Sequence, residues 1–343
     1  MSEGLHNPAP TPQPSLAAVS GMEDLLALVG PKLALVEQTL RRNLGSRYPS
    51  IAELGTYVNE TGGKRIRPIL VLLSSGMLGY RGELDVLMGA VFEFIHTATL
   101  VHDDIIDEAD TRRGRPSTNR VFGNERTVLF GDFLYIRSMN MALEAGDIRL
   151  IGILAEATER MIEGEIVASH LRGRPDVTAE QHLEIVERKT AWLFSACCRV
   201  AAVLAGGEAD AEERLFRYGM ALGTAFQLVD DLLDLTADEQ TLGKPVASDL
   251  REGRMTLPWI DLYRDAGDGE RALIEAVVRG EDVDPEAFAR LHRALETRGC
   301  LDRTLRLAER HATTARRLAA GFPDSPYRRW LERFPELILR RDR

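Results

Sequence analysis

Two acidic clusters of one pattern stand far apart in the sequence and offer carboxylates for binding a metal ion. Their aspartates follow the spacing D-D-x-x-D and are Asp103, Asp104 and Asp107 in VHDDIIDE and Asp230, Asp231 and Asp234 in QLVDDLLD. Residues four apart share one face of a helix, so the outer aspartates of each cluster form a carboxylate pair. Apolar neighbours place both clusters at the edge of a core, where buried carboxylates need cations. If the two faces meet, they predict an oxygen-rich metal site.

A glycine-rich basic loop, GGKRIRP at residues 62–68, supplies the opposite charge. Its glycines permit close backbone approach, and Lys64, Arg65 and Arg67 place three cations around whatever occupies the turn. An ordinary basic loop before a helix has the same appearance. Two further cations, Arg112 and Arg113, follow the first acidic cluster. Cations and carboxylates together predict a site for phosphorylated substrates bridged by Mg²⁺.

Helical periodicity runs through almost the whole chain and would position these groups. The predicted helices cover residues 22–44, 50–59, 67–78, 83–107, 127–145, 149–170, 179–205, 209–235, 255–262, 270–278, 285–297 and 301–320. Strand-like alternation is scarce, so the predicted fold class is all-α. Because no Pro- or Gly-rich linker divides the body, residues 21–343 are expected to form one helical domain. The Pro-, Ala- and Ser-rich residues 1–20 are expected to form a disordered tail.

Composition narrows the classes of function. A net charge of -10 argues against general binding of nucleic acid, and 44% hydrophobic residues suffice for a large core. Cys197, Cys198 and Cys300 lack metal-ligand spacing, which is typical of free thiols in a reducing compartment, so a cytoplasmic location is expected. No apolar run reaches the roughly 18 residues that span a bilayer, so any membrane contact is expected to be peripheral.

Taken together, the motifs resemble those of the trans-polyprenyl diphosphate synthase family, most closely its long-chain, octaprenyl-type bacterial members. These motifs are GGKRIRP, EFIHTATLVHDDIIDEADTRRGRPS, GDFLY, ERKTA, GTAFQLVDDLLD and LGKPVASDLREGRMTLP. The resemblance implies a single-domain isoprenoid-synthase helical bundle around a central active-site cavity. It also implies a homodimer that uses Mg²⁺ to join an allylic diphosphate to successive isopentenyl diphosphates, releasing diphosphate.

The resemblance assigns the charged groups to two substrates. Isopentenyl diphosphate would be held by Lys64, Arg67, His96 and Arg113. The allylic diphosphate would be held by Arg112, Lys189 and Lys244. Mg²⁺ on that allylic diphosphate would be held by Asp103, Asp107, Asp230 and Asp234. The metal offsets the charge that develops on the departing diphosphate.

Near the allylic carbocation the family places Lys189, Thr190 and Gln227. Oxygen dipoles of Thr190 and Gln227 can stabilise the cation without competing as nucleophiles. Gln227 precedes Asp230 by three residues, so helix geometry alone places it on roughly the same face. A buried glutamine that bonds a backbone group is the structural alternative. The isopentenyl double bond would attack the cation, and loss of a proton to the released diphosphate would complete one elongation.

Ala98 and Thr99, just before the first acidic cluster, are the predicted chain-length residues. The family has large aromatic residues at these positions in short-chain enzymes, so two small residues imply a tunnel that stays open past the farnesyl stage. The implied product is a long all-trans chain, suited to a quinone. An ideal helix places Thr99 near the Asp103 stripe and Ala98 to the side, so the inference for Ala98 rests on resemblance. Candidates for the tunnel floor, each explained more simply by core packing, are Phe133, Met139 and Met141.

Three alternative functions remain: a synthase of shorter products, a non-catalytic subunit and a terpene cyclase. A medium-chain synthase would stop at geranylgeranyl diphosphate. A non-catalytic subunit of a heteromeric synthase would carry damaged acidic clusters, and both clusters are intact here. A terpene cyclase needs no second diphosphate site, which Lys64, Arg67 and Arg113 argue against.

The histidines near the first cluster have two interpretations. Glu93 and His96 have the Glu-x-x-His spacing of di-iron bundles, but the other match, at residues 3–6, falls in the tail. His102, beside Asp103, can orient a metal ligand or serve a structural role.

Overall fold

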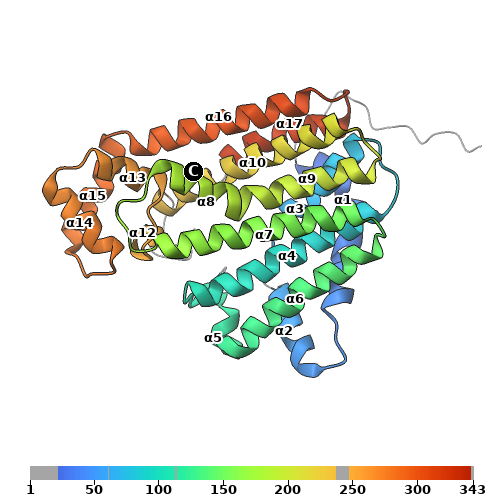
Figure 1. Cartoon of the computed structure of the whole chain (residues 1–343), viewed down its shortest axis with the longest axis horizontal. Coiled ribbons are helices and arrows are strands. Elements are labelled where there is room, and N and C mark those ends of the chain that lie inside the picture. The colour runs from blue at the N-terminus through green and yellow to red at the C-terminus, as the bar shows by residue number, and fades with distance from the viewer. Residues whose placement is uncertain (1–21, 61, 113, 237–246, 341–343) are drawn as a thin grey trace, which may run out of the picture.

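The computed structural model describes residues 22–60, 62–112, 114–236 and 247–340, and these form a bundle of helices (Figure 1). The predicted tail, residues 1–20, lies outside them. The first helices are α1 (Met22–Leu44), α2 (Pro49–Glu60), α3 (Ile66–Met77), α4 (Leu84–Ile106), α5 (Thr118–Phe122), α6 (Asn124–Glu144), α7 (Ile148–Leu171) and α8 (Ala179–Val186). The later ones are η1 (Glu187–Ala191), α9 (Trp192–Leu204), α10 (Ala209–Thr236), α12 (Ser248–Arg251), α13 (Leu257–Arg264), α14 (Asp268–Val278), α15 (Pro285–Thr297), α16 (Cys300–Ala320) and α17 (Pro326–Leu339). A short antiparallel hairpin pairs β1 (Thr111–Arg112) with β2 (Arg115–Pro116).

The all-α prediction is confirmed, and most helix bounds shift by no more than three residues. Helices α1 and α15 begin and end at the predicted residues. The predicted segment 179–205 divides into α8, the π-helical turn η1 and α9. The short helices α5 and α12, the hairpin and α17 were not predicted.

Helix α17 escapes the sequence pattern because Pro335 lies inside it. A proline lacks the N–H that would bond the carbonyl four residues earlier, here that of Leu331. The hydroxyl of Tyr218, on α10, donates to this Leu331 carbonyl at 2.8 Å instead. Trp330 and Phe334 are buried on the same helix. Burial of an apolar face, with a tertiary hydrogen bond to the orphaned carbonyl, therefore outweighs the local cost of the proline.

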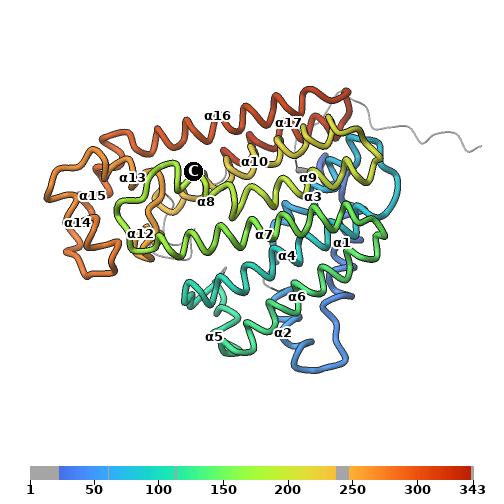
Figure 2. Tube along the Cα trace, viewed as in Figure 1, coloured from blue at the N-terminus to red at the C-terminus, as the bar shows by residue number. Residues whose placement is uncertain are grey.

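Helix α4 carries the first acidic cluster and is largely buried. It packs against α1, α3, α6 and α9, and α6 lies alongside it in Figure 2. By length and composition α4 could cross a membrane, which corrects the expectation that no segment reaches that limit. However, 67% of its most apolar window is buried inside the protein. Its hydropathy therefore reflects contact with neighbouring helices.

All three cysteines are free, as predicted, and all three are buried. Burial raises the pKa of the Cys198 thiol to about 12 and also raises that of Cys197. Both thiols therefore stay protonated near neutral pH and pack as small apolar side chains.

Candidate active site

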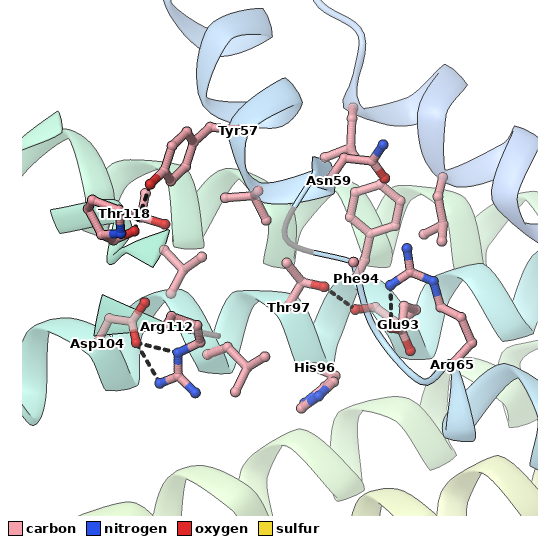
Figure 3. A pocket seen from close by; sticks show the side chains of 17 residues that line it. Tyr57, Asn59, Arg65, Glu93, Phe94, His96, Thr97, Asp104, Arg112 and Thr118 are labelled. Atoms are coloured by element: carbon pink, nitrogen blue, oxygen red, sulfur yellow. Dashed lines mark hydrogen bonds and ion pairs between the residues drawn. The ribbon is translucent and has the colours of Figure 1, made fainter. Parts of the chain in front are cut away.

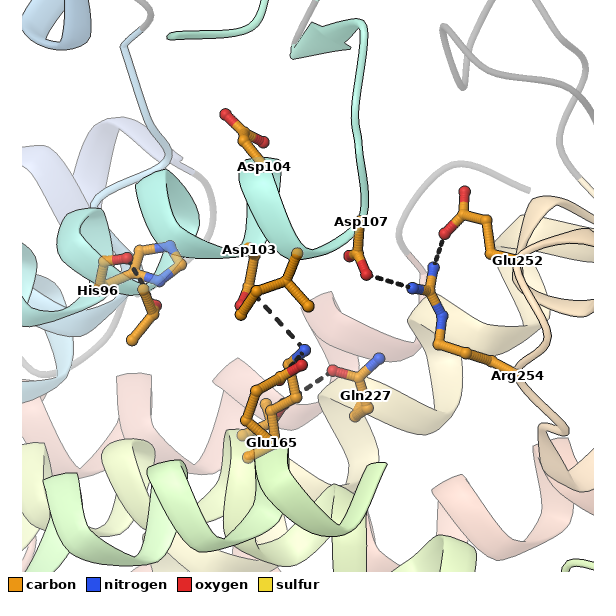
Figure 4. Close-up of polar contacts among 12 residues, drawn as sticks. His96, Asp103, Asp104, Asp107, Glu165, Gln227, Glu252 and Arg254 are labelled. Carbon is orange, nitrogen blue, oxygen red and sulfur yellow. Dashed lines mark hydrogen bonds and ion pairs between the residues drawn. The ribbon is translucent and has the colours of Figure 1, made fainter. Parts of the chain in front are cut away.

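Three carboxylates crowd the C-terminal end of α4. Asp103 and Asp104 lie in its last turn, and Asp107 is its C-cap. The C-terminus of a helix carries a partial negative charge, which disfavours nearby carboxylates. This end of α4 therefore needs cations, and other elements supply them (Figure 4).

Asp103 shares one cation with a second carboxylate. Lys189 Nζ, from η1, lies 3.6 Å from Asp103 Oδ2 and also forms an ion pair with Glu165 of α7. Burial raises the pKa of Asp103 to about 6; Lys189 opposes this shift, whereas Glu165 and Asp107 add to it. Burial would lower the pKa of Lys189, but the carboxylates outweigh burial and raise it. The ammonium stays charged, and a further cation would stabilise the pair of carboxylates.

Asp107 is held by two arginines from other segments. Arg172 Nη2 and Arg254 Nη1 lie 2.6 and 3.1 Å from Asp107 Oδ1. Burial alone would raise the pKa of Asp107, but Arg254, Lys189 and Arg172 together lower it. Arg254 also forms ion pairs with Asp249 and Glu252, so it links the end of α4 to the segment around α12 (Figure 4).

Asp104, the middle residue of the cluster, is buried and bonded to Arg112. Arg112 Nε donates to Asp104 Oδ1 at 2.6 Å. Burial raises the pKa of Asp104, and Arg112 opposes that shift. Arg112 was predicted to hold the allylic diphosphate. It remains 32% exposed, so a substrate can still reach its guanidinium.

The second acidic cluster lies on α10, where its aspartates have different surroundings. Asp230 is exposed, whereas Asp231 and Asp234 are buried. Asp234 Oδ1 accepts from the Ser248 hydroxyl at 2.6 Å, and Oδ2 accepts from the Asp249 backbone N–H at 3.1 Å. In this arrangement Asp234 anchors the first turn of α12.

The donor set suits a hard divalent cation, since Mg²⁺ prefers carboxylate oxygens. Across residues 22–60, 62–112, 114–236 and 247–340, no three His, Cys, Asp or Glu side chains gather closely enough to hold one ion. Among these residues the protein alone therefore does not provide a complete set of ligands for a metal ion. Mg²⁺ usually binds through one or two carboxylates together with substrate phosphates. The surplus negative charge around Asp103 fits a metal that arrives with a diphosphate.

In the glycine-rich loop, the charge of Arg65 is paired within the protein, whereas Lys64 and Arg67 remain candidates for binding an anion. Arg65 has a left-handed backbone with φ 51° and pairs with Glu37 at 2.5 Å and Glu93 at 2.9 Å. Arg65 thus ties the loop to α1 and α4, so its charge is paired within the protein, and it also lines the pocket with Gly62. The pairing also engages Glu93, and no metal-holding acidic or histidine cluster exists among the described residues. The di-iron alternative is thus not supported.

Arg67 and Lys64 keep the character of anion-binding groups. Arg67 stacks over the Phe194 ring at 5.2 Å, and its buried Nε has no hydrogen-bond partner within the described structure. Burial lowers the pKa of the Arg67 guanidinium, with Glu93 opposing. A buried donor left unpaired costs free energy, which an incoming anion would recover. Lys64, three residues earlier in the loop, is exposed.

A pocket opens between α1, α2, α4 and the hairpin, and its lining includes predicted site residues (Figure 3). His96, Asp104 and Arg112 contribute polar groups, and Leu40 and Leu44 form part of an apolar wall. The fold therefore brings His96 and Arg112, from two segments, to one cavity.

Ala98 and His102 lie one turn apart on the same face of α4. His102 Nε2 lies 3.2 Å from the Val128 carbonyl and 3.5 Å from Asp132, both on α6, so His102 connects α4 to α6. Ala98, which is buried, therefore also faces α6. Thr99 is half-buried, and its hydroxyl donates to the His96 carbonyl at 2.8 Å.

Thr190 and Gln227 meet across two helices. The Thr190 hydroxyl donates to Gln227 Oε1 at 2.8 Å. The π-helical turn η1 (Glu187–Ala191) makes this contact, because a π-turn adds a residue and redirects the side chains within it. Lys189 then reaches α4, and the next residue, Thr190, reaches α10.

A glycine makes room for η1, which gives a first prediction. A Cβ on Gly223, on α10, would lie 2.5 Å from Ala191 Cα. Gly223→Ala should therefore push η1 away from α10, cost about 1–3 kcal/mol of folding free energy and lower kcat. Thermal unfolding and steady-state rates measure this. Gly152→Ala, on α7 with open space around it, is the matched control and should not lower Tm. Equal Tm for the two variants would contradict the packing argument.

Two predicted site residues lie outside the described structure, and three residues that contact the site were not predicted. Arg113 and Lys244, predicted to hold diphosphates, lie outside the described residues. Glu165, Arg172 and Arg254 contact predicted site residues but were not predicted. Arg254 lies within the motif LGKPVASDLREGRMTLP, which was the available signal; the spacing of the other two gave none.

Known proteins resemble the chain over nearly its whole length. Residues 48–295 match the polyprenyl synthetase family. Octaprenyl diphosphate synthase of Escherichia coli (strain K12) is 36% identical over 322 residues, covering 94% of this chain and 99% of that protein. A crystal structure of a polyprenyl synthase from Caulobacter crescentus CB15, complexed with calcium and isoprenyl diphosphate, superposes with a TM-score of 0.89 at 32% identity and covers 95% of this chain and 99% of that one. A decaprenyl diphosphate synthase from Rhodobacter capsulatus gives a TM-score of 0.88 at 36% identity, with 94% and 99% coverage.

These matches span the helices that carry both acidic clusters, the basic loop and η1. The chain therefore belongs to the polyprenyl synthetase family and is a prenyltransferase with the all-α isoprenoid synthase fold.

Proposed function

We propose that this prenyltransferase condenses farnesyl diphosphate, or a similar allylic primer, with successive isopentenyl diphosphates to a long-chain all-trans polyprenyl diphosphate of octaprenyl-like length. The observation that carries the chain length is the pair of small residues, Ala98 and Thr99, just before the acidic cluster on α4. Relatives named as octaprenyl and decaprenyl diphosphate synthases support the same length. A quinone side chain is the proposed use of the product.

The proposed metal is Mg²⁺, held on the allylic diphosphate by Asp103, Asp107, Asp230 and Asp234. When bound, it supplies positive charge to the departing diphosphate. The solved Caulobacter relative, described with calcium and isoprenyl diphosphate, supports a divalent cation, and both calcium and magnesium prefer oxygen ligands.

The chain's own groups divide the remaining work. Lys189 sits between Asp103 and Glu165, where it can also bind the departing diphosphate. Thr190 and Gln227 present oxygen dipoles to the allylic cation. Lys64 and Arg67 hold the diphosphate that is retained, and the unpaired Arg67 Nε supports that role.

A homodimer is proposed from an apolar stripe on the outside of the bundle. Leu129, Ile136 and Leu143 of α6 are 61%, 55% and 58% exposed and recur every seven residues, which keeps them on one face. Ile162 and Ile166 of the neighbouring α7 are also exposed. Several exposed apolar side chains on neighbouring helices are typical of a subunit interface.

Ile136→Glu is accordingly expected to convert the dimer into a monomer, because it buries a charge in that interface. Light scattering during size-exclusion chromatography measures the mass. Leu26→Glu, at an exposed apolar position on α1, is the control and should stay dimeric. A wild-type monomer, or a dimeric Ile136→Glu variant, would contradict the proposed interface.

A cytoplasmic location and transient contact with a membrane are also proposed. The three free, buried thiols support a cytoplasmic location. A long hydrocarbon product favours transient contact with a membrane surface during release.

Product chromatography tests the function. The purified protein is incubated with Mg²⁺, farnesyl diphosphate and isopentenyl diphosphate, and the product is expected to be longer than C20. A product of C20 or less favours the medium-chain alternative, a geranylgeranyl diphosphate synthase. Cyclic hydrocarbon formed without isopentenyl diphosphate would indicate a terpene cyclase. No turnover by the protein alone would point to a subunit of a heteromeric synthase.

Ala98→Phe should shorten the product toward C15–C20, because an aromatic ring would fill the space between α4 and α6. The same chromatography measures chain length, and the rate of the first condensation should remain. Ala98→Ser, which preserves the small volume, is the control. An unchanged product from Ala98→Phe would remove Ala98 from the tunnel.

A further inference from the structure

Asp231, the middle aspartate of the second cluster, has no role in the proposed metal site, yet it is buried and has two nitrogen partners. Its Oδ2 lies 2.9 Å from His182 Nε2, and its Oδ1 accepts from Gln227 Nε2 at 3.0 Å. The side chains of His182 and Asp231 are only 9% and 4% exposed. A buried carboxylate of this kind persists only where donors satisfy it, and His182 and Gln227 provide them.

These contacts decide which way the Gln227 amide points. The oxygen and nitrogen ends of a glutamine amide are nearly identical in shape, so neighbours must set their order. A carboxylate accepts hydrogen bonds and cannot donate them, so Asp231 takes the NH₂ end. The oxygen end is then directed to Thr190, whose hydroxyl donates to it at 2.8 Å.

The resulting chain of four side chains connects three elements. It runs from His182 on α8 to Asp231 and Gln227 on α10, and ends at Thr190 in η1. Asp231 and Gln227 are four residues apart on one helix face. The single Thr190 proton is used within the chain, so the remaining lone pairs of Thr190 and of the Gln227 carbonyl are negative dipole ends.

We infer that His182 and Asp231 are positioning residues that lock the polarity of Gln227 and Thr190, so that oxygen and not NH₂ faces the allylic cation. This inference rests on the proposed roles of Thr190 and Gln227 in the prenyl transfer. A reversed amide would place its positive end toward the cation in a partly desolvated site, where fixed dipoles act strongly on charge. His182 acts indirectly, through Asp231. It supplies the second donor that keeps the Asp231 carboxylate oriented toward Gln227.

The test compares two His182 variants. His182→Leu removes the donor, whereas His182→Gln keeps an N–H that can reach Asp231. His182→Leu should lower kcat by about 10- to 100-fold with little change in KM for either diphosphate, since His182 is buried against Asp231 and is not among the proposed diphosphate-binding residues. His182→Gln should retain most of the wild-type kcat. Equal losses in both variants at equal Tm would overturn the inference.

A double-mutant cycle separates positioning from general destabilisation. In a Gln227→Leu background there is no amide to orient, so adding His182→Leu should cause no further loss of kcat. Losses that multiply would mean that His182 acts independently of Gln227 and would overturn the inference. Asp231→Asn, which can turn either end toward Gln227, gives a second cycle that should behave in the same way should His182→Leu fail to fold.

A readout without turnover distinguishes this inference from the proposed function. In full-length protein labelled with ¹⁵N-glutamine, the Gln227 side-chain signal is assigned by its loss in Gln227→Leu. Its NH₂ protons should exchange slowly in the wild type and at least 10-fold faster in His182→Leu. Unchanged exchange would overturn the lock. A short product, or no product, from the wild type would defeat the proposed function and leave this measurement valid.

Discussion

Asp103→Asn is expected to lower kcat by about 10³-fold, equivalent to about 4 kcal/mol of activation free energy. The amide keeps the size of the side chain but removes the charge that attracts a divalent cation. Asp103 has the strongest case because it is buried, faces a second carboxylate and has only Lys189 within ion-pair distance among the described residues. Initial rates at saturating farnesyl and isopentenyl diphosphates measure the loss.

Asp110→Asn is the matched control for this variant. Asp110 lies on the same segment, is exposed and forms an ion pair with Arg120, so the change in charge is the same without a role in the site. Its rate should equal that of the wild type. Raising the Mg²⁺ concentration should partly restore Asp103→Asn if the defect is metal affinity. Near-normal turnover by Asp103→Asn would show that Asp103 is not a metal ligand.

Lys189→Met should reduce kcat/KM for the allylic primer by about 10²-fold. Its ammonium lies between Asp103 and Glu165 at the end of α4, where the departing diphosphate is proposed to bind. Methionine preserves much of the apolar stem and removes the charge. Rates measured against farnesyl diphosphate, with isopentenyl diphosphate saturating, give the value.

The loss in Lys189→Met is expected for the allylic primer and not for isopentenyl diphosphate. Lys189→Met should leave KM for isopentenyl diphosphate near its wild-type value. Lys64→Ala should do the reverse, raising KM for isopentenyl diphosphate and sparing the primer. If both variants affected both substrates equally, the division of cations between two diphosphate sites would be wrong.

The sequence predicted the features that depend on neighbouring residues along the chain. Helices such as α1 and α15 follow from apolar residues at intervals of three and four, and the paired aspartates of α4 follow from the pitch of a helix. The motifs also predicted the family, because they combine two acidic clusters with a basic loop. These inferences need no knowledge of which helices touch.

Only the tertiary structure decided which charges meet. Arg65 lies in the same loop as Arg67 yet pairs with Glu37 and Glu93, and the end of α4 receives Lys189 from η1 and Arg254 from beyond α12. The π-turn η1 cannot be recognised from the periodicity of residues 179–205, because it adds only one residue to the helix. Its close packing against α10 is a tertiary contact.

The hydrogen-bonded side chains around Asp231 are a second example of contacts that only the tertiary structure determines. The D-D-x-x-D pattern places this middle residue to the side of the paired aspartates and names no partner for it, whereas the fold places it beside His182, 49 positions away, and Gln227. Spacing along one helix determines which side chains share a face. Which partner lies opposite that face is set by the packing of separate helices, and their burial then fixes which ionic and polar groups must be paired.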